Sequence, residues 1–189
     1  MARPSKREQL IDAAYDHFHE HGFNGSGVKD ITDAAGVPKG TFYNHFESKE
    51  ALAVEVMRRY AAAQCTEMLA DESMAPFERV RAHFAHLAAG LARFDYARGC
   101  MLGNFGVELS TQSTAIREAV DESFNCWVSF LASALEEACA TGSLASPVGG
   151  VRLARFLANS WEGAAARAKV TRSRGPVDDF AAVLESLAA

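Results

Sequence analysis

The sequence lacks long hydrophobic runs. No window of its 189 residues approaches 18 uninterrupted apolar positions, so no transmembrane helix is expected. The first nine residues are polar without an apolar segment, which predicts a cytoplasmic protein. The four cysteines lie far apart without a CxxC pair, which disfavours a disulfide framework or a zinc site and favours reduced thiols. The spacing of the cysteines indicates no bound metal, and we expect no cofactor.

The sequence also lacks the motifs of common enzymes and the patterns of β-strands. It has no G-x-S-x-G, H-E-x-x-H, P-loop or dinucleotide fingerprint. Period-two alternation bounded by turn pairs is missing as well. We therefore expect an all-α protein that is not an enzyme. A thiol-dependent enzyme, pairing Cys100 with His83 or His86, is a remote alternative.

An excess of positive charge is the third absence. The formal net charge is −5, and residues 1–59 carry eight Lys or Arg against nine Asp or Glu. This balance excludes a general nucleic-acid binder that acts through an overall basic field. Any DNA binding must depend on the local placement of a few residues and on dimerisation.

The most informative segment that is present spans residues 36–52, GVPKGTFYNHFESKEAL. Pro38 suits the first turn of a short helix. Phe42 and Phe46 lie four apart, so they share one helix face and can anchor it to a core. Ser48 is a good N-cap for the next helix. Outward residues would then offer donors to phosphates and base edges, namely Lys39, Gly40, Thr41, Tyr43 and Asn44.

The preceding residues complete a helix-turn-helix pattern. Ser5 and Glu8 form a capping box that opens a first helix, and Gly22 is suited to end it. A second short helix is expected over about 28–35, followed by a turn at Gly36. The short helix after this turn is the candidate reader of the DNA major groove.

Residues 5–52 resemble the DNA-binding domain of TetR-type transcriptional regulators, above all in 39–46 and 48–52. The chain departs from the common pattern at Gly27, where many relatives have Thr or Ser, and at Pro38, where many have Ser. The resemblance implies a cytoplasmic homodimeric repressor with a DNA-binding domain over 1–50 and a regulatory and dimerisation domain over 51–189. Two recognition helices would enter successive major grooves of a quasi-palindromic operator, about 34–36 Å apart. The expected DNA-binding residues are Lys29, Lys39, Gly40, Thr41, Tyr43, Asn44, His45 and Lys49.

The remainder of the chain is predicted to be helical, for about nine helices in all. Helices are expected over about 48–70, from Pro76, and over 113–140, 148–169 and 176–189, while the glycines of 99–106 should weaken a helix there. Small residues at 163–166 allow close helix approach, which is compatible with a two-fold, four-helix dimer interface or with an intrachain core helix. The family resemblance favours dimerisation through the last two helices.

A sensor site is expected near Cys100. The preceding Arg98 could lower the pKa of its thiol and make it reactive toward oxidants or electrophiles, although a free cysteine is also a common small core residue. Residues from Gly99 to Lys169 resemble, more weakly, the NemR-like branch of electrophile- and oxidant-responsive TetR-type repressors. That resemblance implies that Cys100 is the sensor and that Lys169 is its cationic neighbour.

The competing hypothesis is induction by a small apolar ligand without covalent chemistry. Aromatic and aliphatic side chains could line a pocket between helices, with His83 and His86 supplying polar contacts, or could simply form a core. His17 and His21 have a spacing that could chelate a metal, but no further ligand completes such a site. The candidate pocket residues are Phe84, Leu87, Leu91, Phe105, Phe124, Trp127 and Trp161.

Overall fold

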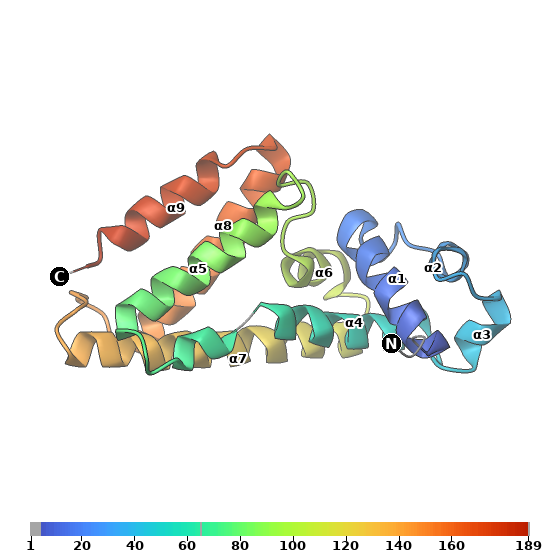
Figure 1. Cartoon of the computed structure of the whole chain (residues 1–189), viewed down its shortest axis with the longest axis horizontal. Helices are drawn as coiled ribbons and strands as arrows, with labels where there is room; N and C mark the ends of the chain where they lie inside the picture. Colours follow the sequence, from blue (N-terminus) through green and yellow to red (C-terminus); the bar gives the residue numbers. More distant parts are fainter. Residues whose placement is uncertain (1–4, 65, 189) are drawn as a thin grey trace. The chain divides into compact units, whose positions relative to one another are not determined.

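The computed structural model describes residues 5–64 and 66–188, and its regular elements are helices (Figure 1). Within this part of the chain the only β-type pairing is an isolated bridge between Leu144 and Ala188, so the all-α prediction is confirmed. None of the described helices is both long enough and apolar enough to span a bilayer. The elements are α1 (Lys6–His21), α2 (Val28–Ala34), α3 (Lys39–Tyr43), α4 (Lys49–Ala63), the 3-10 helix η1 (Thr66–Ala70), α5 (Pro76–Ala92), α6 (Met101–Leu109), α7 (Thr114–Ala140), α8 (Gly150–Thr171) and α9 (Gly175–Glu185).

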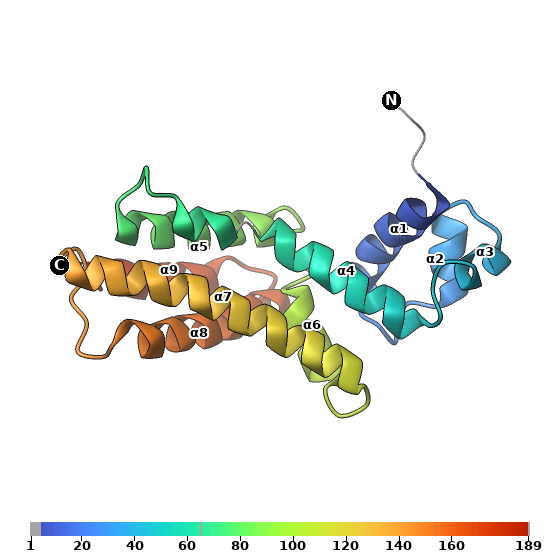
Figure 2. The ribbon, with the colours of Figure 1, turned by 90° about the horizontal axis from the view of Figure 1, so that it is seen from below.

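The first of two compact units contains the described residues up to Ala61 together with Met101–Asp121. In it α1, α2 and α3 contact one another (Figure 2). On α1 the buried residues include Ile11, Ala14 and Phe18, whose spacing of three and four places them on one face. Its start is capped as predicted, because the Glu8 amide donates to Ser5 Oγ at 3.2 Å.

The expectation that glycines weaken a helix around residues 99–106 is wrong, because helix α6 forms there. It is regular from Met101 to Leu109 despite Gly103 and Gly106. Its buried face includes Phe105, whose ring packs 5.6 Å from Phe18 and 6.1 Å from Phe23. Burial of these aromatic rings outweighs the roughly 1 kcal/mol that each glycine costs a helix.

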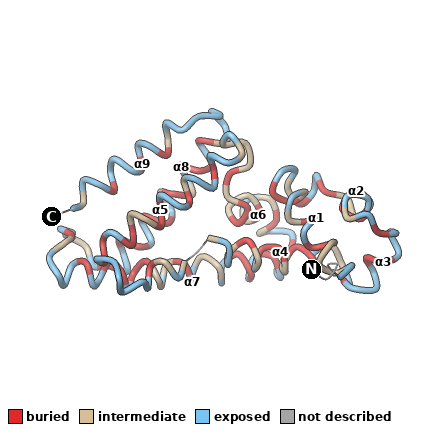
Figure 3. Tube along the Cα trace, in the orientation of Figure 1, coloured by how far each residue is buried: buried red, intermediate tan, exposed pale blue. Residues whose placement is uncertain are grey.

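The second unit contains Ala62–Cys100 and Glu122–Ala189, and therefore η1, α5, α8, α9 and most of α7. Buried positions recur along one side of α5, α8 and α9, as in amphipathic helices (Figure 3). The rings of Phe84, Trp161 and Phe180 meet at centroid distances of 4.7–5.6 Å and join three helices of this core.

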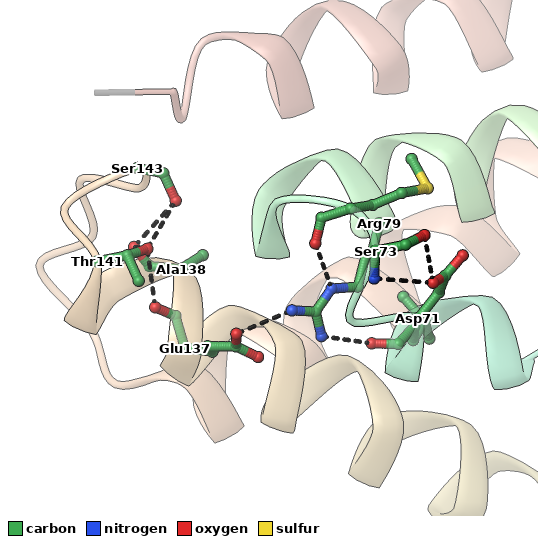
Figure 4. A network of polar contacts seen from close by, with 9 residues as sticks. Asp71, Ser73, Arg79, Glu137, Ala138, Thr141 and Ser143 are labelled. Atoms are coloured by element: carbon green, nitrogen blue, oxygen red, sulfur yellow. Dashed lines mark hydrogen bonds and ion pairs between the residues drawn. The ribbon is translucent and has the colours of Figure 1, made fainter.

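The prediction of one helix over 48–70 is wrong. The α-helix ends at Ala63, and Thr66–Ala70 form the separate element η1; Cys65 lies outside the described residues. Within the second unit, Arg79 holds η1 and the start of α5 in place (Figure 4). Arg79 is only 4 % exposed. Its guanidinium donates to the carbonyls of Leu69 and Met74 and to the Glu137 carboxylate at 2.8–3.3 Å.

The last helix also ends earlier than predicted. Helix α9 stops at Glu185, and the chain beyond it pairs with the connection between α7 and α8. Ala145 donates its amide to Leu187 O at 3.2 Å, beside the Leu144–Ala188 bridge. The amides of residues 186–188 still donate to carbonyls three or four residues earlier at 3.1–3.2 Å, while the Leu187 carbonyl accepts from Ala145 instead of from a further helical turn. The predicted end at Ala189 lies outside the described residues.

Candidate DNA-binding interface and sensor site

The short helix α3 presents most of the predicted contact residues to solvent. Phe42 and Phe46 are both buried with their rings 5.8 Å apart, which confirms the predicted anchor. The exposed Tyr43 ring packs edge-on against Phe42 at 5.1 Å and keeps 60 % of its surface free. The further exposed residues of this segment are Lys39, Gly40, Asn44 and His45.

Thr41 departs from the predicted outward face. It is buried, at 9 % exposure, where an outward side chain was expected. The helix has only five residues, and the fully buried Phe42 next to Thr41 turns that flank toward the core. A contact between Thr41 and DNA stays a prediction, and the outward surface of α3 is smaller than the sequence indicated.

Lys29 stands on α2 with its ammonium paired to a neighbour. Its Nζ lies 2.5 Å from Asp33 Oδ2, one turn further along the exposed face. The hydrogen bond and the negative charge of Asp33 raise the pKa of Lys29. The ammonium stays fully charged at neutral pH, but a phosphate would have to compete with Asp33 for it.

Lys49 has a structural role that the sequence analysis missed. Its Nζ donates to the carbonyls of Phe23 and Ser26 at 2.9 and 3.1 Å and lies 3.9 Å from the centre of the Phe23 ring. Burial lowers the pKa of this ammonium, and the negative charge of Glu108 opposes that effect. The predicted phosphate contact stays a prediction, since these carbonyls already occupy two of the three donors.

In the second unit, Cys100 lies against the core and its thiol is hydrogen-bonded to the carboxyl group of Glu162. Burial raises the pKa of Glu162 to about 7, and the thiol hydrogen bond opposes part of that rise. Sequence analysis did not single out Glu162. A signal was present, because Glu162 continues the i, i+4, i+7 spacing of the buried Ala158 and Ala165.

The two cations expected near Cys100 differ in their placement. The Arg98 guanidinium lies over the Phe94 ring, 4.0 Å from its centre. Lys169 is half-buried and follows Glu162 by seven residues, which places both on one face of α8. An effect of either cation on the thiol stays a prediction.

The candidate pocket residues do not all come together. Five of them, Phe84, Leu87, Leu91, Trp127 and Trp161, belong to the buried core of the second unit, and the half-buried Phe124 packs against it. Phe105 instead packs with Phe18 and Phe23 in the first unit. His83 is fully buried and accepts a 2.8 Å hydrogen bond from the Trp127 indole, whereas His86 is exposed.

His17 and His21 are the pair whose spacing could chelate a metal. Their rings lie 5.6 Å apart on α1. The described residues contain no group of three or more His, Cys, Asp or Glu side chains placed to hold a metal ion.

Helices α1, α2 and α3 share a buried core and leave most of the short helix α3 exposed, and a larger helical unit belongs to the same chain. This arrangement is typical of a helix-turn-helix DNA-binding regulator. Comparison with known proteins identifies the family. Residues 10–56 match the family of bacterial regulatory proteins of the tetR type, and residues 76–184 match the tetracyclin repressor-like C-terminal domain. The chain belongs to the TetR family of transcriptional regulators.

The family relatives extend over nearly the whole chain. It is 39 % identical to the HTH-type transcriptional repressor DhaR of Mycobacterium sp. strain GP1, over 97 % of this chain and 92 % of that protein. It is 33 % identical to the transcriptional regulator AcuR of Cereibacter sphaeroides, over 92 % and 80 % of the two chains. The repressor NemR of Escherichia coli K12 is 28 % identical over 97 % and 94 %.

Solved structures share the same fold. A regulatory protein TetR from Rhodobacter sphaeroides superimposes with a TM-score of 0.88 at 31 % identity, covering 96 % of this chain and 98 % of that one. The reduced form of E. coli NemR gives a TM-score of 0.85 at 30 % identity, covering 98 % of both chains. The protein is thus a TetR-family transcriptional repressor.

Proposed function

We propose that this repressor leaves its operator when an electrophile modifies Cys100. The observation that carries the proposal is the hydrogen bond between the Cys100 thiol and the Glu162 carboxyl group at the core of the second unit. The resemblance to the NemR-like branch supports the same residue, and NemR is among the relatives along the whole chain.

The pair can carry out a balanced addition to an α,β-unsaturated carbonyl compound. Glu162 in its carboxylate form accepts the thiol proton while the sulfur forms a bond to the β-carbon. The electrons of the C=C bond move to an enolate, which takes a proton at its α-carbon from the Glu162 carboxylic acid. The product is a thioether, and no oxidant or further reactant is needed. Lys169, on the same face of α8, is the cation proposed to stabilise charge beside the sulfur.

The DNA-bound form is proposed to be a homodimer assembled through α8 and α9. Phe156, Gly163 and Val170 follow one another at intervals of seven along α8, and Phe156 and Val170 are 60 % and 73 % exposed. Val183 adds a 55 % exposed apolar side chain on α9. A two-fold pairing of these faces would bury them in a four-helix interface.

In this dimer two copies of α3 would enter successive major grooves of a quasi-palindromic operator. The residues proposed to contact DNA include Lys39, Tyr43, Asn44 and His45, which are exposed together. Modification at Cys100 is proposed to shift α4 and so change the distance between the two readers. An error of a few ångströms would prevent both from docking at once.

Induction by a non-covalent apolar ligand is the second candidate. The aromatic cluster of Phe84, Trp127 and Trp161 favours it, because such side chains commonly line ligand pockets. The buried His83 beside Trp127 could supply a polar contact. Under this alternative Cys100 is a core residue.

The decisive experiment measures DNA release by the wild type and by Cys100→Ser, each with and without N-ethylmaleimide. The DNA is a duplex that the wild type selects from a random library. Release of the wild type alone supports the covalent switch, and release of both supports the pocket alternative. Mass mapping under limiting reagent should find Cys100 labelled first. Preferential labelling of Cys65, Cys126 or Cys139 would contradict the proposal, and a wild type that selects no duplex would contradict DNA binding itself.

A further inference from the structure

The loop between α1 and α2, residues 22–27, is held from two sides inside the first unit. On one side, Glu108 near the end of α6 accepts the amide hydrogens of Phe23 and Asn24 at 3.0 and 2.7 Å. On the other side, Lys49 at the start of α4 donates to the carbonyls of Phe23 and Ser26 at 2.9 and 3.1 Å. Four backbone groups of a short loop therefore have charged side-chain partners.

The sequence of the loop fits this arrangement closely. Gly22 has a positive φ of 72°, and a Cβ built on it would lie 2.9 Å from Glu108 Oε2. A side chain at this position would push the carboxylate away from the two amides. The absence of a side chain at Gly22 thus permits Glu108 to approach the backbone.

The loop leads directly into the reader, because Gly27 is the N-cap of α2 and α3 follows α2 after one turn. We propose that Glu108 and Lys49 are positioning residues for operator binding: together they fix residues 22–26 and thereby the direction in which α2 and α3 meet DNA. Neither residue needs to touch the nucleic acid. Hydrogen bonds to charged partners are stronger than neutral ones, and the partly buried setting increases their effect.

Electrostatics make the test for Glu108 sharp. Removal of a carboxylate reduces repulsion from phosphates, so charge alone predicts tighter DNA binding by Glu108→Ala. The positioning role predicts the opposite, a loss of about tenfold in affinity for the selected duplex. Affinity for a scrambled duplex should not fall, because non-specific binding does not require a fixed reader.

The matched control is Glu118→Ala, which removes an exposed carboxylate of α7 in the same unit. It should leave affinity for the selected duplex unchanged or raise it slightly. Glu108→Gln, which keeps one of two acceptor oxygens, should lie between wild type and Glu108→Ala. The proposal is overturned if Glu108→Ala binds the selected duplex as tightly as the control does.

Lys49 gives a second, independent readout. A direct phosphate contact predicts that Lys49→Met lowers the slope of log K against log salt by about one per subunit. The positioning role predicts an unchanged slope together with weaker binding of the selected duplex. A lowered slope would therefore return Lys49 to the DNA contacts and remove it from the proposal.

A measurement on the wild type alone does not depend on whether the variants fold. Amide hydrogen exchange of Phe23 and Asn24 should be slow although both lie in a surface loop, because Glu108 accepts both hydrogens. Exchange at the rate of an unprotected loop would overturn the clamp in solution. In Glu108→Gln at least one of these amides should exchange faster, while the amides within α1 keep their protection.

Discussion

Single residues in this protein have roles that their type alone does not reveal. Lys49 is a cation in a DNA-binding domain, yet its ammonium bonds to two carbonyls of its own chain. Thr41 belongs to the reader segment but is buried beside Phe42. Glu162 is a carboxyl group in line with the buried Ala158 and Ala165 of α8. In each case the neighbouring atoms decide what the functional group does.

Tyr43 is an aromatic residue of α3 with 60 % of its surface exposed. If its ring and hydroxyl contact the operator, Tyr43→Ala should weaken binding of the selected duplex by about 1–3 kcal/mol. Tyr43→Phe separates the hydroxyl from the ring and should lose only part of this. A fluorescence titration at fixed salt measures both variants. Unchanged affinity in Tyr43→Ala would contradict the assignment of this face.

Glu162 should make stability depend on pH. Its pKa is raised from 4.5 to about 7 in the folded protein, so the folded state binds the proton more tightly than the unfolded state. This contribution is fully present below about pH 4.5 and is lost as the pH rises through about 7. Relative to wild type, Glu162→Gln should gain roughly 2–3 kcal/mol between pH 5 and pH 8.

Urea unfolding at several pH values measures that difference, and the exposed Glu118→Gln serves as the control. A difference between Glu162→Gln and wild type that does not change with pH would show that Glu162 titrates normally in the folded state. The same variant should also slow alkylation of Cys100, because it cannot accept the thiol proton.

At the scale of elements, the course of the chain depends on polar side chains that reach across several turns. Arg79 holds η1 and the start of α5 against α7, since its guanidinium reaches two carbonyls and Glu137 (Figure 4). Glu108 does the same for the loop between α1 and α2. Helical periodicity indicates neither the Arg79–Glu137 contact nor the contacts of Glu108 with the loop, because they join residues 58 or more positions apart in the sequence.

Arg79→Met should destabilise the second unit by about 2–4 kcal/mol, because it leaves the Leu69 and Met74 carbonyls without their donor. Arg79→Lys should recover little, since an ammonium lacks the planar fork that serves three acceptors at once. Thermal unfolding measures both, with the exposed Arg93→Met as the control. Equal stabilities of Arg79→Met and Arg93→Met would show that the network contributes nothing.

At the scale of the whole molecule, the proposed function depends on two copies acting together. Residues 1–59 carry little positive charge, so we expect a single copy of α3 to bind DNA weakly and the proposed two-fold partner to supply the missing affinity. The exposed apolar residues of α8 and α9 are the surface proposed for that partner. Helix α6 begins directly after Cys100 and carries Glu108, so the chain itself links the proposed sensor to the reader.

Phe156→Asp should prevent this assembly, because a carboxylate would be buried without a partner at the two-fold interface. The dimer dissociation constant should rise about 30-fold or more. Sedimentation analysis over a concentration series measures it, and Val107→Asp, which changes an exposed residue of α6, is the control. If Phe156→Asp remains dimeric at the protein concentrations at which the wild type is dimeric, this face is not the dimer interface.

The sequence by itself determined the class of the protein. The spacing of Phe42 and Phe46, the caps at Ser5 and Ser48, and the missing strand patterns are local signals, and local signals suffice to predict helices and a helix-turn-helix. The residues exposed on α3 followed from the same periodicity, apart from Thr41.

Only the tertiary structure decided which distant residues meet. Phe105 packs in the first unit and not with the other candidate pocket residues. Lys49 and Glu108, 59 positions apart in the sequence, bond to the same loop, and Glu162 lies beside Cys100. Helical periodicity specifies which face of a helix is buried but not which other helix covers it. That choice depends on the packing of the whole chain, and it is this packing that gives Lys49 and Glu162 their particular chemistry.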